Sequence, residues 1–116
     1  MTMNLNQNHK LMKFEFSPHI AFQVEDYKNA KEFYEKTLGM EVISTSDTET
    51  HFKKGGMNFY MESAETGFTF FEFKTEDVKA AKEELEKAGC KVTQVYSDKS
   101  IMFADPYGMR FHVWSE

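Results

Sequence analysis

The sequence predicts an α+β fold built from two tandem β-α-β-β-β modules. The first observation is a repeat, because EDYKNAKEFYEK at residues 25–36 nearly recurs as EDVKAAKEELEK at residues 76–87, with eight of twelve positions identical at a constant offset of 51. The second observation is that short apolar runs surround both copies in the same order. A lone surface helix needs no near-copy elsewhere in a chain, whereas a duplicated structural unit produces one.

A strand is expected before each copy of the helix. HIAFQV, residues 19–24, aligns with FFEFKT, residues 70–75, when the two helical segments are superposed. Both segments are short, rich in β-branched or aromatic residues and roughly alternating, which is typical of strands.

The ends of the two helices carry recognisable capping residues. Asp26 and Asp77 are placed to accept hydrogen bonds from the first turn of each helix. Gly39 and Gly89 are placed to end the helices in the left-handed conformation, provided that one residue, Leu38, is an insertion in the first copy.

Three further apolar runs follow each helix, and the turn signals SDT, KGG, YSDKS and DPYG separate them. They predict three more strands in each module. The predicted strands are MEVIST at 40–45, ETHFKK at 49–54 and MNFYMES at 57–63, then CKVTQV at 90–95, SIMFAD at 100–105 and MRFHVW at 109–114.

The chain of 116 residues is long enough for one domain. We predict a loose arm at residues 1–13 and a single domain at residues 14–116, with module one at 17–62, a linker at 63–67 and module two at 68–116. One module cannot bury both faces of its sheet. We therefore expect the two modules to form a curved, open eight-stranded mixed sheet around a central cavity, with the helices outside.

Composition excludes several classes of function. The net charge of −5 argues against nucleic acid as a partner, and no basic patch points to a membrane surface. No run of eighteen apolar residues predicts a membrane span. Cys90 is the only cysteine, so an internal disulfide is impossible. With a polar N-terminal segment that lacks a secretion signal, this favours a cytoplasmic location.

Strand periodicity sorts the side chains between the helix face and the cavity. Ile20 and Phe22 are expected to pack against the helix, so His19 points the other way. Phe59 and Phe111 match in register, which makes Tyr60 and His112 equivalent cavity positions. The side chains predicted to face the cavity, or to share the parity of those that do, include His19, Tyr60, Glu62, Phe68, Phe70, Glu72, Arg110, His112 and Trp114.

The pattern resembles the vicinal oxygen chelate superfamily, which includes glyoxalase I, extradiol dioxygenases, fosfomycin-resistance enzymes and bleomycin-resistance proteins. The segments that carry the resemblance are HIAFQVEDYKNAKEFYEKTLGMEV at 19–42 and FADPYGMRFHVW at 103–114, and the resemblance spans residues 17–115. It implies the duplicated fold. It does not imply one reaction, because members of the superfamily catalyse several reactions or only bind ligands.

The resemblance also implies where a metal would be held, on the inward positions of the first and last strands of each module. Those positions are His19, Tyr60, Phe70 (or Phe68) and His112. Phe cannot ligate a metal and Tyr is an uncommon ligand, so the set departs from the His, Gln or Glu of the metal-dependent members. The departure favours loss of the metal.

The leading hypothesis is a domain that binds a small organic molecule in an aromatic-lined cavity and needs no cofactor. It resembles the bleomycin-resistance branch, whose metal-free members bind their ligands as homodimers, and a homodimer is expected here. The predicted ligand-binding residues are His19, Tyr60, Phe68, Phe70, Arg110, His112 and Trp114. The aromatic members of this set could equally be core filling between strands.

The alternative is a metal-dependent lyase, isomerase or dioxygenase that acts on vicinal oxygens. A divalent ion (Zn, Ni, Fe or Mn) would then be held by His19, Glu72 and His112. Glu62 and Glu72 are the candidates for catalytic residues, with Glu62 as a possible general base. A third hypothesis is a role in assembly or regulation through exposed sheet edges.

Three other residues that could carry chemistry are not assigned to the site. His9 and His51 have polar neighbours in the sequence, which predicts that they lie on the surface. Cys90 follows a helix end beside Lys91 and is interpreted as a half-buried packing residue, since no histidine lies nearby in the sequence to activate its thiol.

Overall fold

The computed structural model describes residues 13–65 and 67–116, so the predicted arm lies almost entirely outside the described residues. The chain is α+β, and its eight strands form a mixed sheet in the order β3-β4-β5-β2-β6-β9-β8-β7. The order begins at β3 and ends at β7, so the sheet is not closed. The described residues divide into two compact units, residues 17–72 and residues 73–116 with residues 13–16.

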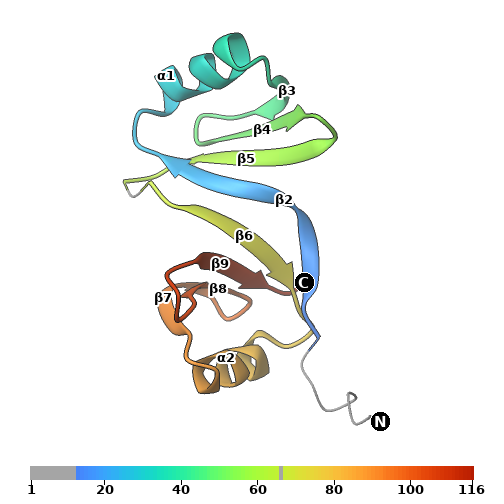
Figure 1. The fold of residues 1–116 in the computed structure, drawn as a ribbon, viewed down its shortest axis with the longest axis vertical. Helices are drawn as coiled ribbons and strands as arrows, with labels where there is room; N and C mark the ends of the chain where they lie inside the picture. The colour runs from blue at the N-terminus through green and yellow to red at the C-terminus, as the bar shows by residue number, and fades with distance from the viewer. Residues whose placement is uncertain (1–12, 66) are drawn as a thin grey trace. The chain divides into compact units, whose positions relative to one another are not determined.

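The first unit contains most of β2 (Glu15–Val24), α1 (Tyr27–Glu32), β3 (Glu41–Thr45), β4 (Glu49–Lys54) and β5 (Met57–Ser63). Strand β2 pairs with β5 in parallel, and β4 lies antiparallel between β3 and β5. In Figure 1, α1 lies along one face of these strands.

The second unit contains α2 (Val78–Lys87), β7 (Lys91–Ser97), β8 (Ser100–Ala104) and β9 (Arg110–Trp114). Strand β8 lies antiparallel between β7 and β9, and α2 covers one face (Figure 1). Strand β6 (Thr69–Lys74) crosses the boundary between the units after Glu72. All eight predicted strands are present. Seven have ends within two residues of those expected, whereas β2 begins at Glu15, four residues before the predicted start at His19.

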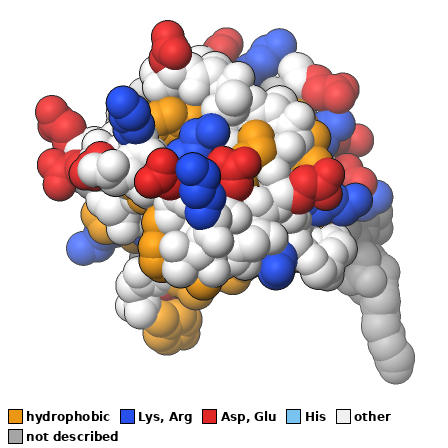
Figure 2. Space-filling view, turned by 90° about the horizontal axis from the view of Figure 1, so that it is seen from above, with side chains coloured by type: hydrophobic (Ala, Val, Ile, Leu, Met, Phe, Trp, Pro, Cys, Tyr) orange, Lys and Arg blue, Asp and Glu red, His pale blue; other side chains and the backbone are white. Residues whose placement is uncertain are grey.

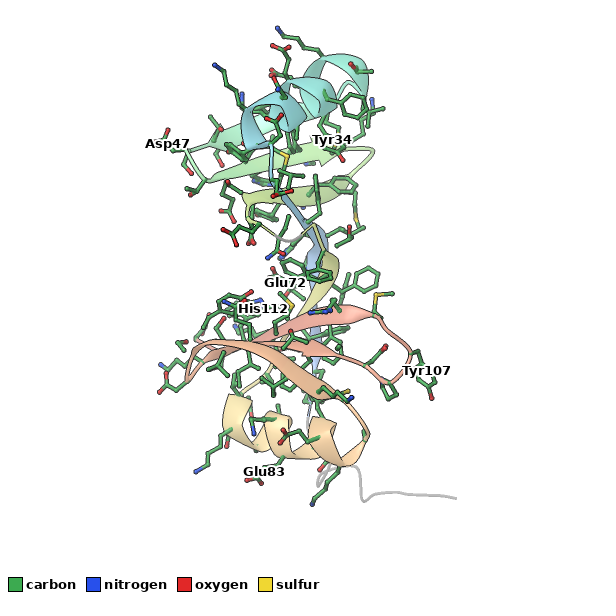
Figure 3. All side chains as sticks on the ribbon, turned by 90° about the vertical axis from the view of Figure 1, so that its left-hand side faces the viewer. Tyr34, Asp47, Glu72, Glu83, Tyr107 and His112 are labelled. Carbon is green, nitrogen blue, oxygen red and sulfur yellow. The ribbon has the colours of Figure 1, made fainter. Side chains whose placement is uncertain are left out.

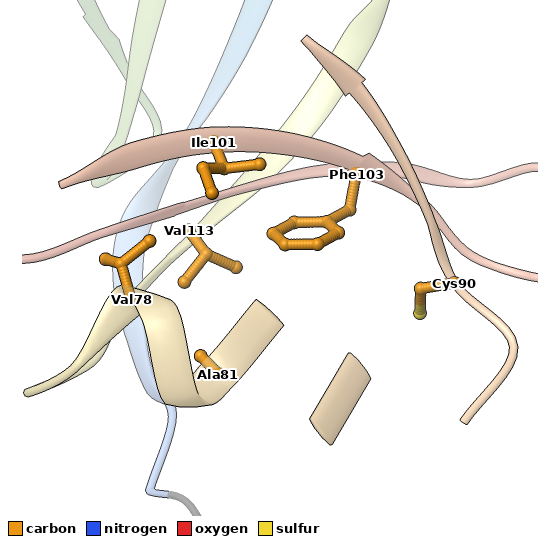
Figure 4. Packing of buried hydrophobic residues seen from close by; sticks show 6 residues of the cluster. All are labelled: Val78, Ala81, Cys90, Ile101, Phe103 and Val113. Carbon is orange, nitrogen blue, oxygen red and sulfur yellow. The ribbon is translucent and has the colours of Figure 1, made fainter. Parts of the chain in front are cut away.

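Each unit has its own core between helix and sheet. In the second unit, Val78 and Ala81 of α2 pack against four buried residues of the strands and the preceding loop: Cys90, Ile101, Phe103 and Val113. Figure 4 shows this cluster. In the first unit the core cluster under the helix consists of the buried residues Met40, Phe52 and Met61, and the helical residues around them, Tyr27, Ala30 and Tyr34, are only partly buried.

The caps are as predicted, but the first helix is not one regular helix. Asp26 and Asp77 each accept a hydrogen bond from a first-turn backbone N–H, and Gly39 and Gly89 adopt positive φ. Helix α1 ends at Glu32 and continues as the π-helix η2, Phe33–Thr37.

The extra residue explains the π-helix. From Asp26 to Gly39 the chain advances 39 − 26 = 13 positions, and from Asp77 to Gly89 it advances 89 − 77 = 12. The backbone N–H of Leu38 donates to the Phe33 carbonyl at 3.2 Å, which is the i to i+5 bond of a π-turn. The insertion is therefore absorbed inside the helix, and both helical segments end at equivalent glycines.

In the described residues, no helix is long and apolar enough to cross a bilayer. Figure 2 shows a face on which acidic and basic side chains alternate, with hydrophobic side chains between them.

Tyr107, at 92% exposure, lies at the tip of the turn between β8 and β9 and points away from the strands (Figure 3). The turn is held by the Asp105 carboxylate, which accepts from the backbone N–H groups of Tyr107 and Met109.

Candidate functional site

The centre of the candidate site is a histidine–carboxylate pair in the first unit. His19 on β2 and Glu72 on β6 place Nε2 and Oε1 2.9 Å apart, and their side chains are only 19% and 16% exposed. Phe22 and Val24 pack against the helix-side core, as the strand periodicity predicts. His19 has the opposite parity and therefore lies on the other face of the sheet, away from α1.

Two more aromatic rings extend this pair along the same face. The His19 ring meets the ring of Tyr60 edge to face, with centroids 4.6 Å apart. Tyr60 stacks on His51 of the neighbouring strand, with centroids 4.4 Å apart and the planes 15° from parallel. His51 Nε2 lies 2.8 Å from the side-chain oxygen of Asn58. Glu72, His19, Tyr60 and His51 thus form one continuous cluster, here called the histidine cluster.

These contacts determine which atoms of the cluster can accept a hydrogen bond. An ionised carboxylate only accepts, so His19 Nε2 carries the proton in the bond to Glu72. In the neutral imidazole, Nδ1 is then an acceptor. The same reasoning applies to His51, whose Nε2 donates to the Asn58 side-chain oxygen. The histidine cluster therefore combines two imidazole acceptors with a phenol and a carboxylate.

The prediction that His51 is a surface residue is wrong, and sequence reasoning missed its place in the cluster. Its side chain is half-buried and stacked on Tyr60. The signal was available in the hairpin, because the two glycines Gly55 and Gly56 form the turn that pairs Lys54 with Met57. Counting back along both strands from that pair places His51 opposite Tyr60 on one face.

His112 lies in the second unit and has partners there. Its Nε2 is 2.6 Å from the Ser100 hydroxyl on β8, and its ring meets Tyr96 edge-on, with centroids 5.8 Å apart. Figure 3 labels His112 on β9 and Glu72 on β6. Trp114, on the same parity of β9, has the ammonium of Lys74 5.4 Å from its ring centroid. Arg110 begins β9 opposite Ala104.

The remaining predicted residues occupy different environments in the first unit. Phe70 is 3% exposed, whereas Phe68, just before β6, is 38% exposed and its carbonyl accepts from the Gln23 N–H. Glu62 lies opposite Glu49 across β4 and β5, beside a hollow at the turn between β3 and β4 that Ser46, Thr48 and Ser63 also line.

The predicted metal ligands are divided between the two units. His19 and Glu72 are adjacent, whereas His112 belongs to the other unit and is bonded to Ser100. Within residues 13–65 and 67–116, no three His, Cys, Asp or Glu side chains form a group able to hold a metal ion. Two donors fall short of the three protein ligands that catalytic zinc sites usually have.

A family model and several solved structures match this chain. The model of the Glyoxalase/Bleomycin resistance protein/Dioxygenase superfamily matches residues 17–113. The chain therefore belongs to that superfamily, as the sequence resemblance predicted. A search of curated proteins finds no match.

The solved structures that match show the same fold at low sequence identity. Homoprotocatechuate 2,3-dioxygenase from Brevibacterium fuscum, in complex with 3,4-dihydroxyphenylacetate, matches with a TM-score of 0.62 and 14% identity over 90% of this chain and 37% of that one. The enzyme of the same name from Arthrobacter globiformis matches with a TM-score of 0.60 and 17% identity, also over 90% and 37%.

A Mn(II)-bound glyoxalase from Novosphingobium aromaticivorans matches with a TM-score of 0.59 and 21% identity over 90% of this chain and 40% of that one. The present chain thus spans well under half the length of these matched structures. The likeness extends to the fold alone.

Proposed function

We propose that this chain binds a small aromatic molecule carrying hydrogen-bond donors, on the sheet face that holds the histidine cluster. The supporting observation is the unbroken contact from Glu72 through His19 and Tyr60 to His51. Aromatic rings offer a surface on which a planar guest can stack. The imidazole Nδ1 atoms and the carboxylate accept from hydroxyl or ammonium groups.

In this proposal Glu72 is a positioning residue. By accepting from His19 Nε2 it fixes both the orientation of the imidazole and the tautomer in which Nδ1 is the acceptor. His19 then accepts a proton-bearing group of the guest, and Tyr60 contributes its ring and hydroxyl. The net charge of −5 favours a neutral or cationic guest over an anionic one.

The named ligand of one structural neighbour guides the choice of probe. The Brevibacterium fuscum dioxygenase is in complex with 3,4-dihydroxyphenylacetate, whose ring carries adjacent hydroxyl donors. Catechol retains those two hydroxyls without the acidic side chain. Its dimethyl ether, 1,2-dimethoxybenzene, retains the ring and the oxygens but has no donor. Comparing these two probes separates the contribution of ring stacking from that of hydrogen-bond donation by the guest.

A titration followed by ¹H–¹⁵N NMR tests the proposal. We expect catechol to shift the amide signals of β2 and β5 around His19 and Tyr60 and to bind more tightly than 1,2-dimethoxybenzene. His19→Ala should weaken catechol binding by about tenfold, the loss of one hydrogen bond and one ring contact. Lys36→Ala on the exposed side of η2 is the control and should change nothing. Equal affinity for the two probes, or an unaffected His19→Ala variant, contradicts the proposal.

The metal-dependent alternative has one supporting observation. Two adjacent ligand atoms bound to one ion at about 2.1 Å lie about 3 Å apart in an octahedral site and about 3.4 Å apart in a tetrahedral one, and His19 Nε2 and Glu72 Oε1 are 2.9 Å apart. His112 as the third ligand, and Glu62 as general base, stay predictions. Stoichiometric metal after purification that disappears in the His19→Ala, His112→Ala double variant would favour this alternative over ligand binding alone.

The other sequence predictions also stay proposals. They are that Phe68, Phe70, Arg110, His112 and Trp114 contact the ligand, and that the chain is cytoplasmic. The homodimer is supported by apolar side chains exposed on the edge strands, where Ile43 of β3 is 47% exposed and Val95 of β7 is 58% exposed. Light scattering at micromolar concentration should give twice the mass of one chain, and a monomer would remove this proposal.

A further inference from the structure

The opposite face of the first unit contains a cavity that the histidine cluster does not use. It has a volume of about 430 Å³ and lies between η2 with its following turn and the strands. Its apolar lining is Ile20, Phe22 and Phe59 from β2 and β5, with Tyr34, Leu38 and Met40 from the helical side. A cavity of this size with mostly apolar walls is within the range of small-molecule sites.

Two polar side chains line the same cavity. Thr69 contributes a hydroxyl, and Lys54, at the end of β4, contributes a primary ammonium. Lys54 Nζ donates to the Gly39 carbonyl at 3.3 Å. Across the described residues, no carboxylate lies within ion-pair distance of this ammonium. The cavity thus pairs an apolar interior with one positive charge that has no counter-ion there.

The π-helix and the turn after it form one wall of the cavity. Leu38, the inserted residue, lines the cavity and is 47% exposed, as is Phe33 at the start of η2. On the α1 side, hydrophobic side chains are visible between charged ones (Figure 2). Gly39 adopts φ of 71°, and a Cβ at that position would lie 3.2 Å from Lys54 Nζ. A side chain at residue 39 would therefore crowd the lysine ammonium at its present position. Single π-turns often occur at functional sites.

We propose that this cavity binds a small aliphatic or aryl monocarboxylate, with its apolar part between η2 and the sheet and its carboxylate on Lys54. A carboxylate replaces the Gly39 carbonyl as the principal partner of the ammonium, in a charge-assisted hydrogen bond. The Thr69 hydroxyl donates a second bond. This site does not depend on the proposed function, since its lining residues on β2 and β5 have the opposite parity to His19 and Tyr60.

The test uses octanoate and 1-octanol, which share a chain length but differ in charge, in ¹H–¹⁵N NMR titrations of the full chain. Octanoate should shift the amide signals of Ile20, Leu38, Met40 and Thr69 and bind about tenfold more tightly than octanol, as expected for one charge-assisted bond. Equal affinities of the two probes, or octanoate shifts confined to other residues, overturn the proposal.

Matched variants locate the charge that matters. Lys54→Met keeps the length of the side chain and should reduce octanoate affinity about tenfold while leaving octanol binding unchanged. Lys53→Met, the neighbouring exposed lysine of β4, is the control and should bind octanoate as the parent chain does. If Lys54→Met binds octanoate as tightly as Lys53→Met, the proposal fails.

A second variant fills the cavity without touching the charge. Ile20→Phe adds volume on the β2 wall and should weaken both octanoate and octanol. His19→Ala, one residue away on the other face, should leave octanoate binding unchanged. Octanoate binding that is lost in His19→Ala but kept in Ile20→Phe would place the carboxylate on the histidine cluster and overturn this assignment.

Discussion

The two units have the same order of elements after their first strands but bury their helices differently. Helix α2 buries Val78 and Ala81 under its sheet, whereas no residue of α1 or η2 is fully buried. The difference follows from one inserted residue, Leu38, which turns the end of the first helix into a π-turn. The insertion thus changes the helical turn while both ends of the helical segment stay in register with the second copy.

The equivalent core positions show how each unit adapts. At the repeat offset of 51, Tyr27 and Thr50 of the first unit replace Val78 and Ile101 of the second. The Tyr27 hydroxyl donates to the Ser46 carbonyl at 2.9 Å and accepts from the hydroxyl of the buried Thr50 at 2.5 Å. The first unit therefore uses polar contacts where the second uses apolar packing.

The largest expected effect compares Phe103 with its counterpart Phe52, both of which are fully buried. Phe103→Ala should lower the free energy of unfolding by about 3–5 kcal/mol, because it leaves a cavity among the five other buried residues of its cluster. Phe52→Ala should cost less, since its partly buried neighbours can relax into the space. Urea denaturation followed by circular dichroism measures both, and an equal or larger loss for Phe52→Ala would show that the two cores are packed alike.

A smaller effect is expected at the polar contact of the first unit. Tyr27→Phe removes the hydroxyl that bonds Thr50 and Ser46 and should cost about 1–2 kcal/mol in urea denaturation. Thr50 retains the Thr45 hydroxyl at 2.9 Å as a partner, which limits the loss. Tyr107→Phe, in an exposed turn, is the matched control and should have no measurable effect. A Tyr27→Phe variant as stable as the parent chain would mean that packing alone holds α1.

Removing the N-terminal caps of the two helices should lower the free energy of unfolding by a smaller amount. Asp77 accepts from the Ala80 N–H at 3.1 Å and Asp26 from the Asn29 N–H at a longer 3.4 Å. Asp77→Ala should therefore cost about 1 kcal/mol in the same denaturation experiment, and Asp26→Ala somewhat less. Asp47 lies in the turn between β3 and β4 and caps no helix, so Asp47→Ala serves as the control. A greater loss for Asp26→Ala would indicate that its side-chain bond to Asn29 Nδ2 matters more than the backbone bond.

The fold could be predicted from the sequence because its signals are local and occur twice. The repeated helix, its Asp caps and the glycine-bounded strands each specify structure without long-range information. The face of His19 followed from strand periodicity, and its contact with Tyr60 agrees with the shared cavity face predicted for both. The direct bond to Glu72 was not predictable, because it depends on how β2 and β6 are placed and on a rotamer choice.

Two features of the site required the structure for other reasons. His51 was assigned to the surface because its sequence neighbours are polar, although the hairpin register pairs it with Tyr60. The cavity beside η2 was not expected at all. Leu38 was recognised as an insertion, but a sequence does not show whether an inserted residue extends a loop or, as here, widens a helical turn.

The smallest expected effect is on the pH dependence of stability. It compares Cys90 and Met40, the buried residues that follow Gly89 and Gly39. Burial, and secondarily the Asp105 carboxylate, raises the pKa of the Cys90 thiol above its ordinary value. The folded state therefore favours the neutral thiol. Its contribution to stability is fully present below the ordinary thiol pKa and is lost as the pH rises through the raised pKa of the folded chain.

Denaturation of the parent chain and Cys90→Ala between pH 7 and pH 10 measures this contribution. The difference in free energy of unfolding should be constant near neutral pH and should shrink in the alkaline range, as the thiolate becomes favoured in the unfolded chain. Met40→Ala, at the equivalent position of the first unit, has no ionisable group to lose, so its difference from the parent should not vary with pH. A constant difference for Cys90→Ala up to pH 10 would mean that the thiol ionises as readily in the folded chain as in the unfolded one. The turn after Gly89 would then enclose Cys90 less completely than the turn after Gly39 encloses Met40.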